Sequence, residues 1–110
     1  AAAHATALIE RGVTAIVTGS DLQALGVIRT ISSLGMRVPE DISVIGFDDS
    51  FLMSRLSPGL TTIHQPVASI VSSAVRSIFE AMAAPEHTPT HADYVFSPDL
   101  VVRGTTARAT

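Results

Sequence analysis

The chain has 110 residues, the size of a single domain, and 46% of them are hydrophobic while only 15% are charged, which predicts apolar surface that faces a partner. Its net charge of −3 and the lack of an arginine cluster exclude DNA binding by these residues alone. It contains no Cys and no Lys, which excludes disulfides, thiol chemistry and a Schiff-base lysine.

The chain also lacks the signals of a membrane or secreted protein. No apolar stretch approaches 18 residues, and the N-terminus has no basic flank of a signal peptide, so a cytoplasmic protein without membrane contact is expected. The chain begins at Ala1 without an initiator Met, which indicates a piece of a longer protein.

Two helices and one strand are expected in the first third of the chain. Residues 2–11 form a helix that Gly12 ends, and residues 15–18 form a short strand. Ser20 and Gln23 then fit a capping box that starts a helix to Leu34, with Gly35 as its C-cap. The apolar residues of this second helix fall on two sides. One side is expected on the sheet and has Ala24, Val27, Ile28, Ile31 and Leu34, and the other has Leu22, Leu25 and Met36 around Arg29.

Two continuous apolar runs follow, and each ends in polar residues. Residues 42–47 lead into Asp48 and Asp49, and residues 60–63 lead to Gln65, with a helical turn expected at 51–56 between them. Such runs are typical of parallel strands that are buried on both faces, and ligands bind beyond the carboxyl ends of these strands. Asp48 and Gln65 are therefore expected beside a pocket.

The last part of the chain predicts one long helix and two short strands. Pro66 starts a helix whose apolar residues recur at helical spacing from Val67 to Met82. Residues 85–90 form a loop, residues 94–96 and 100–102 form strands, and residues 104–110 form a frayed tail. The alternation of strands and helices predicts the α/β class with a doubly wound, mostly parallel sheet.

Five motifs follow one another along the chain. They are Thr18-Gly19-Ser20-Asp21, Ala24-Leu25-Gly26, the loop from Gly35 to Asp41, Gly46-Phe47-Asp48-Asp49 and the segment from Leu60 to Pro66. Their order and spacing resemble the late effector-domain region of LacI/GalR-type transcriptional regulators. The resemblance extends over residues 1 to 104 and corresponds to the last third of such a regulator, so it implies a partial periplasmic-binding-protein-like effector domain.

The resemblance implies a division of the chain between two lobes. Residues 1–63 would belong to the C-terminal lobe. Residues 64–98 would contain a hinge crossing with a helix and a strand of the N-terminal lobe, and residues 99–110 would be a returning strand and tail. The hinge residues would be Ile63, His64, Gln65 and Pro66.

Four residues are candidates for contact with a small-molecule effector. This effector is expected to be a sugar, or else a nucleoside or purine. Asp48 offers about four lone-pair sites to the hydroxyls of a sugar or to a purine N–H, although a loop carboxylate exposed to solvent is the alternative. Ser20 and Asp21 start a helix, where capping and ligand contact are compatible. Gln65 also has two explanations, ligand contact and N-capping. Asp49 is expected to be a turn or cap residue.

The resemblance also implies a homodimer, in which the second helix pairs with its copy across a two-fold axis. Scattered exposed apolar residues are the alternative explanation. The residues expected at the interface are Leu22, Leu25, Arg29, Met53 and Leu56.

Two functions from different classes fit these features. The first is the effector-binding and dimerising portion of a repressor, which would contact operator DNA only through an N-terminal headpiece outside these residues. The second is a solute-binding protein of the same fold that delivers a sugar to a transporter.

An enzyme is not expected, because no catalytic motif or phosphate loop is present and adjacent strand residues Asp48 and Asp49 would point to opposite faces. No cofactor is expected. His87 and His91 have metal-ligand spacing, but Pro89 between them argues against a helix, so no metal site is expected.

Overall fold

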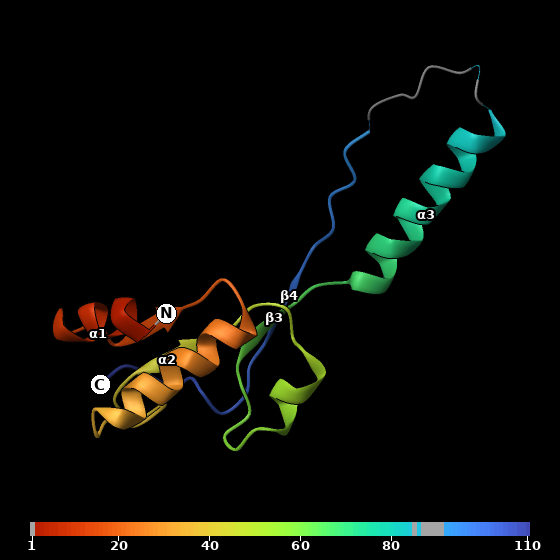
Figure 1. Cartoon of the computed structure of the whole chain (residues 1–110). Coiled ribbons are helices and arrows are strands. Elements are labelled where there is room, and N and C mark those ends of the chain that lie inside the picture. The colour runs from red at the N-terminus through yellow and green to blue at the C-terminus, as the bar shows by residue number, and fades with distance from the viewer. Residues whose placement is uncertain (1, 85, 87–91) are drawn as a thin grey trace. The chain divides into compact units, whose positions relative to one another are not determined.

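The computed structural model describes residues 2–84, 86 and 92–110, and the chain divides into two compact units. The first unit comprises residues 1–64 and 99–110, and the second comprises residues 65–98. In the first unit lie α1 (Ala2–Glu10), β1 (Ala15–Val17), α2 (Asp21–Ser33), β2 (Ser43–Ile45), the 3-10 helix η1 (Phe51–Arg55), β3 (Thr62–His64) and β4 (Asp99–Val101). The second unit contains α3 (Val67–Ala83) (Figure 1).

The first unit is built on parallel strand pairing. β1 pairs with β2 in parallel, with Ile16 opposite Val44. Parallel bridges at Ile45–Thr61 and Asp48–His64 then continue the pairing from β2 toward β3, as expected for a third parallel strand. β3 also pairs with β4, in the antiparallel direction.

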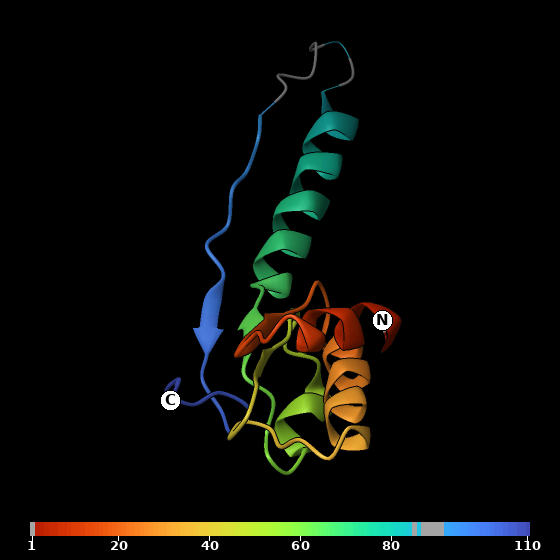
Figure 2. The ribbon, with the colours of Figure 1, turned by 90° about the vertical axis from the view of Figure 1, so that its left-hand side faces the viewer.

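Helices α1 and α2 lie side by side in both views and bury residues in the same core (Figures 1 and 2). Ala5 of α1 and three residues of the expected sheet-facing side of α2 are buried there, but Leu34 at the C-cap is 49% exposed, because it lies beyond the last helical turn. The buried apolar residues are Ala5, Ile16, Ala24, Val27, Ile31, Ile42, Val44, Met53 and Leu60.

The segment after β4 was expected to be a frayed tail, and this expectation is wrong. Thr105 is fully buried, and its carbonyl oxygen accepts a hydrogen bond from Val44 N at 2.8 Å. Ala107 is also bound, since its N–H donates to Ser43 Oγ at 3.1 Å. The tail is ordered because it satisfies backbone groups of β2 that no other strand pairs.

The second unit consists of α3 and the chain that follows it. Pro66 is the N-cap of α3, close to the expected helix start. None of the residues of α3 is buried. The strand expected at residues 94–96 is not present, because no strand lies beside these residues in the described part of the chain and a ladder needs a partner.

Candidate functional site

The candidate site lies where β1, β2 and β3 end, at their carboxyl edge. α2 starts directly after β1, and its first amide, Asp21 N, donates to Phe47 O after β2 at 2.8 Å. Asp48 N donates to Ile63 O of β3 at 2.9 Å. These backbone bonds bring the polar residues that follow three strands together at one edge of the sheet.

Ser20 is the N-cap of α2, as the capping box predicted. Its Oγ accepts from Gln23 N at 3.2 Å, and Gln23 Oε1 accepts in return from Gly19 N at 3.1 Å. Ser20 remains half-exposed at the site edge, so its predicted role in effector contact stays a prediction.

Asp21 is structural, which corrects its prediction as an effector residue. Its side chain is buried, with 1% exposure of the residue, and both carboxylate oxygens are engaged. Oδ1 accepts from Thr62 Oγ1 at 2.6 Å, and Oδ2 accepts from Ser50 N at 2.7 Å. Asp21 therefore joins α2, β3 and the start of η1 and offers no surface to a ligand. Gly46 packs against it so closely that a Cβ there would overlap Asp21 Oδ1.

Asp48 is exposed and has an unusual backbone conformation. Its φ of 112° and that of Asp49, 57°, are positive, which is rare outside glycine. The turn that they form follows β2 at the carboxyl edge of the sheet, and the role of Asp48 in effector contact stays a prediction.

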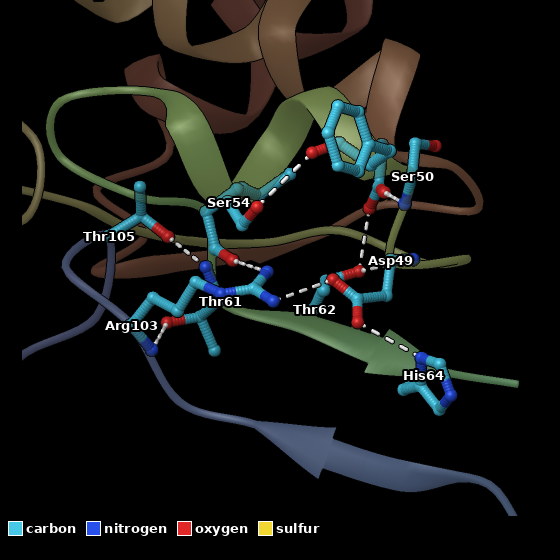
Figure 3. Close-up of polar contacts among 11 residues, drawn as sticks. Asp49, Ser50, Ser54, Thr61, Thr62, His64, Arg103 and Thr105 are labelled. Atoms are coloured by element: carbon cyan, nitrogen blue, oxygen red, sulfur yellow. Dashed lines mark hydrogen bonds and ion pairs between the residues drawn. The ribbon is translucent and has the colours of Figure 1, made fainter.

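Asp49 connects three segments of the chain (Figure 3). Its Oδ2 is 2.9 Å from Nδ1 of His64 on β3, and its Oδ1 is 2.7 Å from Nη2 of Arg103, just after β4. Arg103 also donates to Leu60 O through Nη1 at 3.0 Å. Burial raises the pKa of Asp49, but the hydrogen bonds and positive charges of Arg103 and His64 outweigh it, so the pKa lies below its ordinary value.

Asp48 and Asp49 were expected to point to opposite faces as adjacent strand residues, but both lie beyond β2, which ends at Ile45. The positive φ angles of both aspartates turn Asp49 toward β3, where it contacts His64. The roles of Arg103 and Thr105 were not predicted from the sequence. The signal was present, because Arg103 is one of only seven cations in the chain and directly follows an apolar strand.

Gln65 and Pro66 belong to the second unit, and the boundary between the units falls between His64 and Gln65. The roles of Gln65 in effector contact and of Ile63 to Pro66 as a hinge therefore stay predictions.

The residues predicted for the dimer interface differ in exposure. Leu22 is 76% exposed, Arg29 is exposed, and Leu25 and Leu56 line one hollow of about 250 Å³. Met53 is only 8% exposed and packs in the core, because η1 turns it inward, so it is removed from the predicted interface.

No group of three or more potential metal ligands occurs among the described residues, and His87 and His91 lie outside them. Within the same part of the chain, no helix combines the length and hydropathy needed to cross a membrane.

The chain matches known proteins over nearly its whole length. Residues 1–106 match the model of the periplasmic binding protein-like domain family. The HTH-type transcriptional regulator MalR of Streptomyces coelicolor is 49% identical over 108 residues, which are 97% of this chain and 30% of that protein. The chain thus spans about 30% of the length of this relative.

Solved structures agree in fold. The complex of the transcriptional regulator CelR with cellobiose superimposes with a TM-score of 0.84 at 30% identity, over 94% of this chain and 32% of that chain. A LacI family regulator from Arthrobacter sp. FB24 in complex with lactose gives a TM-score of 0.81 at 30% identity, over 96% of this chain and 40% of that chain.

These matches confirm the predicted fold class, a partial periplasmic-binding-protein-like α/β domain. The relatives MalR and CelR are transcriptional regulators, in line with the expectation that the chain is not part of an enzyme. The chain belongs to the periplasmic binding protein-like domain family, and over almost its whole length it is similar to part of LacI family transcriptional regulators.

Proposed function

We propose that this part of the regulator binds a sugar effector at the carboxyl edge of β1, β2 and β3, with Asp48 and Ser20 as contacts. The observation that carries the proposal is the exposed carboxylate of Asp48, presented by a turn with positive φ beside the N-terminus of α2. A carboxylate accepts hydrogen bonds from two neighbouring hydroxyls, and the amides of a helix start favour polar ligand groups.

The solved relatives support a sugar over a nucleoside or purine, because two of them are complexes with cellobiose and with lactose. The relatives also favour the regulator over the solute-binding alternative. Gln65 stays in the proposed contact set, and residues 65–98 are proposed to contribute to the second lobe of the domain.

A thermal-shift and calorimetry screen of the full-length regulator against cellobiose, lactose, guanine and adenosine tests the effector class. A sugar is expected to raise the melting temperature, since a ligand that binds only the folded state stabilises it. Stabilisation by guanine or adenosine alone would overturn the sugar assignment in favour of the purine class.

The contact itself is tested by Asp48→Ala, which is expected to weaken sugar binding by about 1.5–3 kcal/mol, the usual range for a charged hydrogen bond. Asp41→Ala is the matched control, because Asp41 is also an exposed carboxylate but pairs with Arg37 at 3.4 Å elsewhere on the surface. Equal sugar affinities of the two variants would remove Asp48 from the site.

The regulator is also proposed to be a homodimer that acts on operator DNA in the cytoplasm. Leu22, Leu25, Arg29 and Leu56 are the proposed interface residues, supported by the exposure of Leu22, Arg29 and Leu56 and by the hollow that the half-buried Leu25 shares with Leu56. DNA contact is assigned to a headpiece outside these residues, because the net charge of −3 of this chain disfavours binding to the negatively charged phosphates of DNA.

A further inference from the structure

The position of Asp48 is set by a turn, and contacts hold this turn both before and after Asp48. Before the turn, Gly46 N donates to Thr61 O at 2.9 Å. After it, Asp49 is bound by His64 and Arg103, and Ser50 N donates to the buried Asp21. Two consecutive residues with positive φ each cost about 1–3 kcal/mol and persist only where their surroundings hold them.

The side chain of Asp49 links the turn to β3 and to the segment after β4. Its two oxygens are divided, one for His64 at the end of β3 and one for Arg103 after β4. With 15% exposure, this carboxylate is screened from water better than an ordinary surface ion pair, so its contacts constrain the backbone effectively.

Figure 3 shows the arrangement, with Asp49 between the labelled side chains of Arg103 and His64. His64 lies where the chain leaves the first unit for residues 65–98, and Arg103 lies shortly after the point where the chain returns. A backbone movement at either place would therefore move Asp49 and the neighbouring peptide that carries Asp48.

We propose that Asp49 is a positioning residue for effector binding, which acts through its contacts with His64 and Arg103 by presetting the turn that carries Asp48. The inference rests on the proposed function of Asp48. If the turn is preset, binding of the effector does not have to order the carboxylate of Asp48. Loss of the Asp49 contacts would add this ordering cost and lower the affinity, although Asp49 itself does not touch the effector.

The test is a double-mutant cycle in the full-length regulator, with cellobiose or lactose, whichever binds more tightly in the screen above. Asp49→Asn keeps the size of the side chain and removes its charge. It is expected to weaken sugar binding about tenfold in the wild-type background and less than about twofold in the Asp48→Ala background, because residues that act through one contact are not additive.

Asp41→Asn is the matched control for the charge removal. Asp41 also pairs with an arginine and accepts from the Arg37 amide at 2.8 Å, but it lies on a separate exposed loop. Its sugar affinity should equal that of the wild type. Arg103→Lys should retain more affinity than Arg103→Gln, since lysine keeps the positive charge beside Asp49.

The outcomes separate this inference from the proposed function. If Asp48→Ala leaves sugar affinity unchanged, the proposed site and the inference both fail. If Asp48→Ala weakens binding but Asp49→Asn lowers affinity by the same factor in both backgrounds, only the positioning role fails. Should circular dichroism show that Asp49→Asn is unfolded, His64→Ala replaces it in the cycle, because His64 is half-exposed. The expected pattern is the same, with a smaller loss of about threefold.

Discussion

Replacement of Thr105 by valine should destabilise the first unit by about 2–4 kcal/mol. The hydroxyl of Thr105 accepts from Thr61 N at 2.9 Å and donates to Val44 O at 2.8 Å, and all three residues are buried. Valine has nearly the same shape, so the substitution leaves no cavity but strands one N–H and one C=O away from water. Each stranded group costs about 1–3 kcal/mol of stability. The cost for the carbonyl lies at the low end of this range, because a C=O group with two lone pairs tolerates the loss of one hydrogen bond better than an N–H group does.

Urea unfolding followed by circular dichroism measures this cost as a lower midpoint at unchanged slope. Thr30→Val is the matched control, because Thr30 Oγ1 donates to Gly26 O at 2.9 Å within α2. That carbonyl keeps its helical hydrogen bond when the hydroxyl is removed, so the control should lose less than about 1 kcal/mol. Equal midpoints for the two variants would refute the role of Thr105 in joining β2 and β3.

Three further outcomes follow from the same structure. Gly46→Ala should lower the free energy of unfolding by about 1–3 kcal/mol in urea unfolding, because the added Cβ would overlap Asp21 Oδ1 and lie 2.8 Å from Leu60 Cδ2; unchanged stability would show that Asp21 can move away. The pKa of Asp49 is lowered, so its contribution to stability is present above the ordinary pKa of 3.8 and is lost as the pH falls through the lower folded value. Acid unfolding of Asp49→Asn should therefore be less steep in this range, and a curve parallel to the wild type would contradict the assigned shift. Leu25→Asp should shift the full-length regulator toward monomer in analytical ultracentrifugation, because a dimer would bury an unpaired charge; an unchanged dimer would place the interface elsewhere.

Local signals predicted α2 and its start well. The capping box needs only residues within one turn, and the structure forms its first bond as expected, from Gln23 N to Ser20 Oγ. The apolar run at residues 42–47 likewise predicted β2, and the parallel pairing of β2 with β1 agrees with the α/β class expected from the alternation of strands and helices.

Non-local pairing explains where the predictions were wrong. The sequence around Thr105 is typical of a polar tail, and the backbone and hydroxyl bonds of Thr105 to Val44 and Thr61, which are 61 and 44 positions away, order it. Asp49 and His64 meet because the backbone leaves the strand conformation at Asp48, and the prediction of Asp49 as a turn or cap residue did not indicate His64 as its partner. Met53 illustrates the same limit, since the direction of a short 3-10 helix depends on the core it faces.

The pairing of β3 with β4 makes residues 65–98 an excursion from the first unit. The chain departs at His64 and returns at Asp99, and these two residues are register partners in the antiparallel ladder. Departure and return are therefore as close as the two ends of a hairpin. An Asn-Gly turn that joins His64 directly to Asp99 would have the geometry of an ordinary two-residue β-hairpin. The path of the strands in the first unit therefore does not depend on residues 65–98, which can vary in length and sequence without changing it.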